Sequence, residues 1–335
     1  MKLVYGLDLG SSSIKICKKD SVIELKESSV IEKITNDDGT FSYGLAGNDI
    51  DKYYQKNQNS ELIYPIKSGI VVDKDALIEL LTRFFNKLIP KKSIFQKIEF
   101  YVLAECGLTV EQYNEIREIC YKVGACKVSF LPSAICAIYG YDLELSQFEN
   151  FCLADLGADT AKFYLCSKHS VIKGLSINCA GNAIDEFLGI HALKMENLIL
   201  DKKEKEALKL NVASIMETNN ATYTANGINS QTLVKDSHTF YSNDFKKIMQ
   251  FCFLKYVYFI NEYLRLNYQN GKVVLIYGGS SKFNKLDTYF ADKLDPSSII
   301  ISDKDDIALL GLLKLMKKEN VLDEIINNCK NNINL

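Results

Sequence analysis

Apolar residues along this chain gather into short continuous runs that alternate with longer stretches of helical spacing. Two of the short runs, residues 3–10 and 150–157, are strand-like, and both end in Asp-Leu-Gly. Each is followed by small or polar residues and then by a second strand-like run, at residues 13–17 and 161–166. Each pair therefore predicts two strands joined by a tight turn. Because one chain carries two such hairpins nearly half its length apart, the pattern predicts two domains built on the same plan.

Helical spacing of apolar residues predicts helices at residues 73–88, 109–123, 202–216, 245–266 and 305–317. Asp73 and Thr109 are suited to cap the first two of these helices, and Gly124 is suited to end the second. Residues 272–276 predict a strand that breaks at Gly278 and Gly279. Strands that alternate with helices in this way predict an α/β fold.

Length and composition are compatible with two domains that each bury a core. The chain has 335 residues, of which 47% are hydrophobic, and this is enough to fill two cores of ordinary size. The net charge is −2. Such a balance leaves room for a small basic patch but argues against a general nucleic-acid binder, which usually needs a basic face. No nucleic-acid partner is therefore expected.

The cysteines and the N-terminus indicate a reducing compartment. The ten cysteines form no CxxC pair, and several, such as Cys136, Cys152 and Cys166, lie inside apolar runs. The simplest interpretation is reduced thiols that act as small core hydrophobes. The N-terminus enters a strand without the segments of a signal peptide, and no apolar run reaches the roughly 18 residues of a membrane span. The predicted location is the cytoplasm.

The turns of the two hairpins are candidates for binding phosphate. Backbone N–H groups and hydroxyls in such a turn can point at one anion, and an Asp at the end of the strand can hold a water-bound magnesium ion. One such turn alone is more simply interpreted as an ordinary serine-rich hairpin, but two of them could clamp a triphosphate from both sides. The turn residues are Gly10, Ser11, Ser12 and Ser13 after Asp8, and Gly157, Ala158, Asp159 and Thr160 after Asp155.

Two further segments could contact the rest of a nucleotide. Gly278 and Gly279 follow a strand, where glycines let the backbone approach a flat ligand or a phosphate closely. Glu206 and Lys209 lie one helical turn apart and could reach ribose hydroxyls and an adenine edge together. From spacing alone, an exposed ion pair between Glu206 and Lys209 is the simpler interpretation.

The order of these motifs resembles the actin-like ATPase superfamily, and it is most similar to the MreB family of bacterial actins. The similar stretches are YPIKSGIVVD at residues 64–73, residues 111–128, the run from CAGN to DEF at residues 179–187, and IALLG at residues 307–311. The resemblance covers nearly the whole chain. It implies a two-domain, actin-like (ribonuclease H-like) α/β fold with a nucleotide cleft between the domains.

The resemblance also implies domain boundaries. The first domain is expected at residues 1–146 and 306–335, with a small subdomain at about 29–65. The second is expected at residues 147–305, with a small subdomain at about 184–242.

Carried over to this chain, the family's site residues imply that ATP or ADP binds with Mg²⁺. Asp8 and Asp155 would lie around the metal ion, and the serines of the first turn would touch the phosphates. Glu206 and Lys209 match the family's Glu-x-x-Lys contact to the nucleoside. Gly278 and Gly279 would lie along the adenosine.

The departures from the family pattern concern hydrolysis. MreB proteins carry Glu-Glu-Pro before an alanine-rich helix, and Ser133 occupies the position of their catalytic glutamate; a serine hydroxyl is a poor base near neutral pH. Their second phosphate loop reads Gly-Gly-Gly-Thr, whereas Ala158 adds a Cβ here and Asp159 adds a negative charge beside a polyanion. The chain is therefore expected to be at most a weak ATPase. An alternative gives Asp159 the role of the base.

A small apolar loop could bring the protein to a membrane. Ile94 and Phe95 are flanked by lysines and fall where many MreB proteins carry a membrane-binding loop. They could dip into an anionic membrane surface. A surface loop with its apolar pair folded inward explains the same residues equally well. If the loop does bind, the protein would lie at the inner face of the cell membrane.

Three functions agree with these observations to different degrees. The first is a bacterial actin of MreB type, related to cell shape, that self-associates into protofilaments and has impaired ATP hydrolysis. The second is a monomeric actin-fold adaptor that docks partners at the membrane, as FtsA and PilM do, because the segment from Asp8 to Lys15 resembles PilM as much as MreB. A sugar or acetate kinase ranks last, because no substrate-binding insertion supports it.

Overall fold

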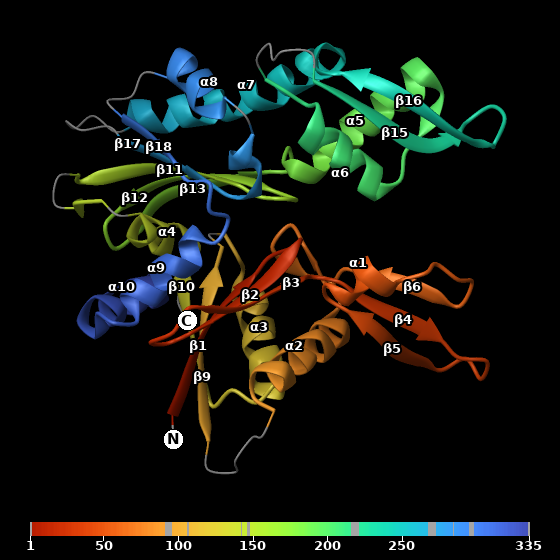
Figure 1. Ribbon diagram of the computed structural model, residues 1–335. Coiled ribbons are helices and arrows are strands. Elements are labelled where there is room, and N and C mark those ends of the chain that lie inside the picture. Colours follow the sequence, from red (N-terminus) through yellow and green to blue (C-terminus); the bar gives the residue numbers. More distant parts are fainter. Residues whose placement is uncertain are drawn as a thin grey trace. The chain divides into compact units, whose positions relative to one another are not determined.

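A computed structural model describes residues 2–90, 96–105, 107–141, 143–145, 148–215, 221–266, 273–283, 285–294 and 298–333 (Figure 1). The chain divides into two compact units. The first comprises Met1–Leu145, Cys166–Gly174 and Asp306–Leu335, and the second comprises Ser146–Leu165 and Leu175–Asp305.

The first unit is built on a five-stranded sheet in the order β10-β9-β1-β2-β3. Its strands are β1 (Lys2–Leu9), β2 (Ser13–Lys18), β3 (Ile23–Ser28), β9 (Lys97–Ala104) and β10 (Lys127–Pro132). β1 and β2 pair antiparallel, which confirms the first predicted hairpin. β1, β9 and β10 run parallel to one another, so their carboxyl ends meet at one edge of the sheet.

Helices pack on both faces of this sheet: α2 (Lys74–Leu88), α3 (Val110–Lys122), α4 (Ser133–Gly140), α9 (Ile307–Leu315) and α10 (Glu319–Ile333). On one face, Phe85 of α2 stacks on Phe100 of β9 with ring centroids 4.6 Å apart. On the other face α9 lies close to β1, because Gly6 has no side chain: a Cβ there would meet Leu312 Cδ2 at 2.6 Å.

A three-stranded sheet, which Figure 1 shows, and a two-stranded hairpin complete the first unit. The sheet has the order β5-β4-β6 and is accompanied by a short helix. Its elements are β4 (Ile31–Thr35), β5 (Phe41–Ala46), α1 (Asp49–Tyr53) and β6 (Ser60–Ile63), and the hairpin is formed by β7 (Ile66–Lys67) and β8 (Ile70–Val71).

A second five-stranded sheet, in the order β13-β12-β11-β17-β18, belongs to the second unit except for the segment Cys166–Gly174 at the β12–β13 connection. Its strands are β11 (Asn150–Leu156), β12 (Ala161–Ser167), β13 (Val171–Ile177), β17 (Val273–Tyr277) and β18 (Ser298–Ile301). β11, β17 and β18 run parallel, so their carboxyl ends also share one edge. The second predicted hairpin, β11–β12, and the strand before Gly278 are both confirmed.

The remaining elements of the second unit are four helices, a single 3₁₀ turn and a small sheet of order β14-β15-β16 among the described residues. They are α5 (Gly181–Glu196), β14 (Leu198–Ile199), α6 (Lys202–Asn211), β15 (Thr222–Asn229), β16 (Lys235–Tyr241), α7 (Ser242–Leu266), η2 (Gly279–Lys282) and α8 (Leu286–Lys293). The core lies between α5–α8 and one face of the β11 sheet.

The predicted character of the cysteines is confirmed: every described cysteine is a free thiol, and all of them except Cys126 are buried. Among the described residues, no helix combines the length and the apolar character that a membrane crossing requires. Ile94 and Phe95 lie outside the described residues, so the predicted membrane loop stays a prediction.

Candidate functional site

The turn between β1 and β2 is tight and depends on a glycine. The Gly10 N–H donates to the carbonyl oxygen of Ser13 at 3.2 Å. A Cβ at Gly10 would lie 2.7 Å from that oxygen, closer than non-bonded atoms approach. The backbone is fixed further by Ser29, whose N–H donates to the Ser12 carbonyl at 2.9 Å. Three polar residues, Ser11, Ser12 and Ser13, are thereby presented at the carboxyl end of β1.

The turn between β11 and β12 repeats this geometry in the second unit. The Gly157 N–H donates to the Thr160 carbonyl at 3.1 Å, and a Cβ at Gly157 would lie 2.9 Å from the same oxygen. The two Asp-Leu-Gly motifs therefore specify the same turn, and each turn lies at the carboxyl end of a parallel strand, where open α/β sheets bind ligands.

Each turn also holds a lysine that sequence reasoning missed. Lys15 Nζ lies 3.5 Å from Asp8 Oδ2, and Lys162 Nζ lies 3.7 Å from Asp155 Oδ2. Both lysine side chains are largely buried. The signal was present in the sequence, because a lysine follows the aspartate at the same spacing in DLGSSSIK and DLGADTAK. Each loop thus pairs its acidic group with a cation suited to an anionic ligand.

The start of α5 holds the second loop in place. The backbone N–H groups of Gly181 and Asn182 donate to the carbonyl oxygens of Gly157 and Ala158, at 3.2 and 2.8 Å. The side-chain amide of Asn182 donates to Asp159 Oδ1 at 2.6 Å. The Asp159 carboxylate, one of the residues that depart from the family pattern, is therefore bonded to the first turn of α5.

The two predicted glycines after β17 have different surroundings. Gly278 has a φ of +100°, and a Cβ there would lie 2.6 Å from the carbonyl oxygen of Leu156 and 2.8 Å from Asp155 Oδ1. A Cβ at Gly279 would meet nothing within 4 Å. The hydroxyl oxygen of Ser280, the next residue along the chain, lies 3.5 Å from the Gly157 carbonyl oxygen. The structure thus brings the Gly278 segment to the second loop and leaves Gly279 exposed beside it.

Lys209 lies in the same neighbourhood but is buried. Its ammonium nitrogen is 2.8 Å from each carboxylate oxygen of Asp185 and 3.3 Å from the Gly181 carbonyl oxygen. Burial raises the pKa of Asp185, and the ammonium of Lys209 opposes that rise. Glu206, its predicted partner in nucleoside binding, is exposed. The pair Glu206 and Lys209 is therefore not an exposed ion pair; Lys209 is bound to Asp185.

In the first unit, Ser133 meets a carboxylate that the sequence did not identify. Ser133 is the first residue of α4 and directly follows β10. Its Oγ donates to Glu105 Oε2 at 3.3 Å. Glu105 follows the last residue of β9, and the available signal was an acidic residue immediately after an apolar strand.

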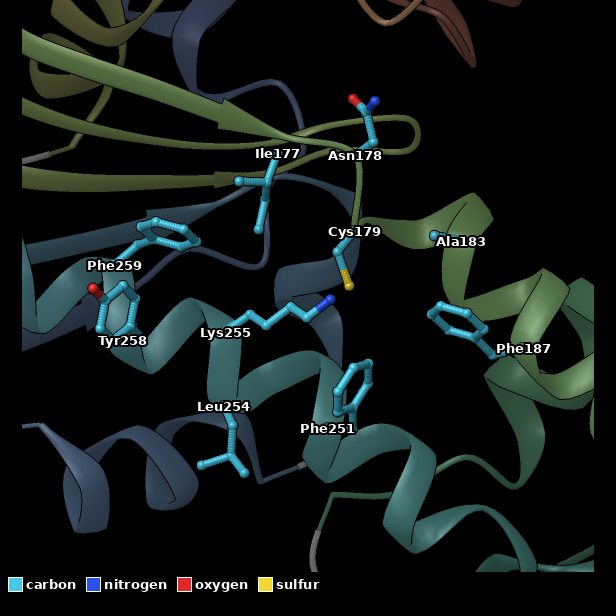
Figure 2. A pocket seen from close by; sticks show the side chains of 10 residues that line it. All are labelled: Ile177, Asn178, Cys179, Ala183, Phe187, Phe251, Leu254, Lys255, Tyr258 and Phe259. Carbon is cyan, nitrogen blue, oxygen red and sulfur yellow. The ribbon is translucent and has the colours of Figure 1, made fainter.

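A separate groove of about 700 Å³ lies in the second unit between the end of β13, α5 and α7. Figure 2 shows the thiol of Cys179 and the ammonium of Lys255 beside the rings of Phe187 and Phe251 in this groove. A hydrogen bond from the thiol of Cys252 lowers the pKa of Cys179. The rest of the lining is mainly apolar. The groove therefore differs from the two loops, whose backbone and side chains are polar.

Comparison with known proteins identifies the family. The sequence model of the MreB/Mbl protein family matches residues 3–324. The chain belongs to the MreB/Mbl family. The resemblance expected from the motifs is thus confirmed, and so is the prediction of a bacterial actin-like protein of the cytoskeletal class.

Curated relatives of this MreB/Mbl protein include the cell shape-determining protein Mbl of Bacillus subtilis (strain 168). The two are 24% identical over 210 residues, which are 63% of this chain and 62% of that protein. Mbl of Bacillus cereus (strain ATCC 10987 / NRS 248) matches with the same identity and coverage. The alignment therefore spans 62% of the length of these relatives.

Solved structures show the fold. MreB5 of Spiroplasma citri, crystallised with ADP, is 19% identical with a TM-score of 0.84, and the match covers 96% of this chain and 98% of that one. The MamK double helical filament is 16% identical with a TM-score of 0.77, covering 95% and 99%. The predicted α/β, two-domain actin-like fold is confirmed. The roles of individual site residues stay predictions.

Proposed function

We propose that this MreB/Mbl protein binds a nucleoside triphosphate through the turns after β1 and β11 and self-associates into protofilaments when the nucleotide is bound. One observation carries the proposal: both units present the same glycine turn, with an Asp–Lys pair, at the carboxyl end of a parallel strand. The crystallisation of MreB5 with ADP and the filament form of MamK support it.

The chemistry of the two loops fits a polyphosphate. Their backbone N–H groups and hydroxyls are donors, and anions bind well to such turns. Lys15 and Lys162 place a positive charge beside each turn and offset the negative charges of Asp8 and Asp155. Gly279 has open space where a Cβ would be, so the backbone there can accept a flat base, whereas Gly278 packs against the second loop and positions this segment.

The acidic residues fit a magnesium ion that is bound mainly by phosphate and water. Within the part of the chain that the structure describes, no three His, Cys, Asp or Glu residues form a cluster that could hold a metal ion. Mg²⁺ in phosphate sites, however, is typically held by one or two carboxylates and by the substrate. Asp8 and Asp155 would supply those carboxylates, and the ion would neutralise phosphate charge.

We expect hydrolysis to be slow. Ser133 occupies the position of the family's catalytic glutamate, and loss of a positioned general base costs about 10²–10⁴-fold in rate. Asp159 is bonded to Asn182, which favours a structural role for this carboxylate over the role of base. Membrane attachment through Ile94 and Phe95 remains a separate proposal that liposome co-sedimentation can test.

Calorimetric titration with MgATP tests nucleotide binding. Wild type should bind, and Asp8→Ala and Asp155→Ala should each abolish the magnesium-dependent part of binding. Asp292→Ala, on the exposed side of α8, is the matched control and should bind as wild type does. Folded wild-type protein that shows no heat of binding at millimolar MgATP would contradict the proposal.

A further inference from the structure

Glu105 and Ser133 lie at the same sheet edge as the first loop. β9 pairs in parallel with both β1 and β10, and the last residues of β9 and β10, Ala104 and Pro132, are direct partners. The residues that follow this pair are Glu105 and Ser133. The β1–β2 turn begins at the carboxyl end of the adjacent strand, so all three segments face the same edge of the first unit.

Glu105 is positioned from several sides. The hydroxyl of Tyr113 is 3.5 Å from the Glu105 carbonyl oxygen. A Cβ at Gly69, in the β7–β8 turn, would lie 3.4 Å from Glu105 Cγ, so this turn packs against the stem of the side chain. The turn belongs to the YPIKSGIVVD stretch, which resembles the family. Tyr113 thus holds the backbone of Glu105 and the β7–β8 turn packs against its side-chain stem, in addition to the hydrogen bond from Ser133.

The hydroxyl of Ser133 is used for Glu105 and not for its own helix. Ser133 is buried, and Pro132 precedes it at the N-cap without a side-chain cap bond. The hydroxyl instead donates to Glu105 Oε2 at 3.3 Å. When this hydroxyl donates to Glu105, its oxygen remains suited to accept a hydrogen from water.

We propose that Glu105, acting through Ser133, supplies the carboxylate for residual nucleotide hydrolysis. The inference rests on the proposed nucleotide binding. It explains why the loss of the family's glutamate need not remove all turnover: the carboxylate has moved from the start of α4 to the end of β9, and the serine now spans the distance.

The proton transfer balances as a relay. The oxygen of a water molecule bonds to the γ-phosphorus, and the bond from that phosphorus to the bridging oxygen breaks, with its electron pair leaving on ADP. The water proton passes to Ser133 Oγ as the Ser133 proton passes to Glu105 Oε2. Glu105 then releases its proton to solvent. In this scheme Ser133 touches the reacting water, and Glu105 is a positioning residue that acts through it.

Single-turnover phosphate release should be measured in wild type, Glu105→Gln, Ser133→Ala and the double variant, with MgATP affinity determined in parallel. Glu105→Gln should slow phosphate release by about 100-fold or more with unchanged affinity and melting temperature. Because the two side chains act as one unit, phosphate release in the double variant should be no slower than in the slower of the two single variants. Glu99→Gln, a carboxylate at the other end of β9, is the matched control.

Two further readouts separate a relay from a structural role. After an incubation long enough for the slow wild-type turnover, nucleotide bound to wild type should be ADP, whereas nucleotide bound to Glu105→Gln should still be ATP. Adding Ser133→Glu to Glu105→Gln returns a carboxylate to the start of α4 and should restore turnover. Equal rates in wild type and Glu105→Gln, or wild type that binds MgATP without any hydrolysis, would overturn the relay alone. Wild type that binds no nucleotide would overturn the proposed function as well.

Discussion

Single side chains at the second loop have separable roles, and the adjacent glycines at 278 and 279 show this most directly. At Gly278 a side chain would strain a backbone of φ +100° and collide with the Leu156 carbonyl. Gly278→Ala should therefore lower the free energy of unfolding by about 3 kcal/mol. Gly279→Ala should change it by less than about 1 kcal/mol, because a Cβ there meets nothing within 4 Å.

Urea denaturation measures both values, and a MgATP titration of the Gly279→Ala protein adds a functional readout. If nucleotide lies along this exposed glycine, Gly279→Ala should weaken MgATP binding without loss of stability. Unchanged binding would instead show that Gly279 does not contact the ligand. A Gly278→Ala protein as stable as wild type would contradict the strained geometry of the turn.

The buried pair of Lys209 and Asp185 allows a second residue-scale prediction. Removing one member leaves the other charge buried without its partner, which typically costs about 3–5 kcal/mol. Lys209→Met and Asp185→Ala should each cost this much near neutral pH. The double variant should be more stable than either single variant, because no buried charge remains. Denaturant titrations of the four proteins give the coupling free energy.

The same pair predicts that the stability cost of Lys209→Met depends on pH. Burial already raises the pKa of Asp185 above its ordinary value of 3.8, and Lys209→Met removes the opposing cation. The folded state then binds a proton more readily than the unfolded state, so its stability falls as pH rises from 3.8 through the folded pKa. Lys209→Met should therefore cost less in acid than near neutral pH. If Lys209→Met lowered the free energy of unfolding equally in acid and near neutral pH, the result would contradict an ionised Asp185 in the folded protein near neutral pH.

Sequence reasoning was effective for residues within a motif and failed for contacts across the fold. The repeated Asp-Leu-Gly located both turns, because a glycine and its hydrogen bond lie only a few residues apart. Glu105 could not be paired with Ser133 in this way, since their proximity arises from the pairing of β9 with β10. The burial of Lys209 likewise depends on Asp185 of another helix, which helical spacing does not reveal.

At the scale of elements, α3 offers the clearest test of local sequence signals. The hydroxyl of Thr109 accepts from the Gln112 N–H at 3.3 Å, and the Gln112 side chain accepts from the Thr109 N–H at 2.8 Å. Thr109→Ala removes the first bond and should cost about 1 kcal/mol of stability. Thr109→Ser keeps a hydroxyl and should be close to wild type. Equal unfolding midpoints for Thr109→Ala and wild type would show that this capping box contributes nothing.

The predicted helices were most accurate where caps accompany the apolar pattern. The prediction for residues 73–88 matches α2, whose N-cap Asp73 accepts from the Ala76 N–H at 2.9 Å. The prediction for residues 202–216 was too long, because α6 ends at Asn211. Val212 and Ile215 are buried beyond its end, so apolar spacing there reflects core packing rather than helix.

Other elements gave weaker signals. α7 begins at Ser242, earlier than the predicted residue 245, and Asp244 accepts from the Tyr241 N–H at its start. α10 was not predicted, although its apolar residues pack at helical spacing. Its many asparagines are poor helix formers, and tertiary packing outweighs that preference.

For the whole molecule, slow hydrolysis has a consequence for filament lifetime. If assembly requires bound nucleotide and turnover is weak, filaments should not lose their triphosphate on the timescale of assembly. The protein that sediments with MgATP should then equal the amount that sediments with a non-hydrolysable analogue, and it should stay constant with time. Electron microscopy of the same samples distinguishes filaments from amorphous aggregates.

Asp8→Ala, which is expected to lose magnesium-dependent binding, should stay in the supernatant, whereas Asp292→Ala should sediment as wild type does. A pellet that decays with MgATP but persists with the analogue would show brisk hydrolysis and contradict the impaired-ATPase proposal. The absence of any nucleotide-dependent pellet, with MgATP binding intact, would instead favour a monomeric actin-fold adaptor.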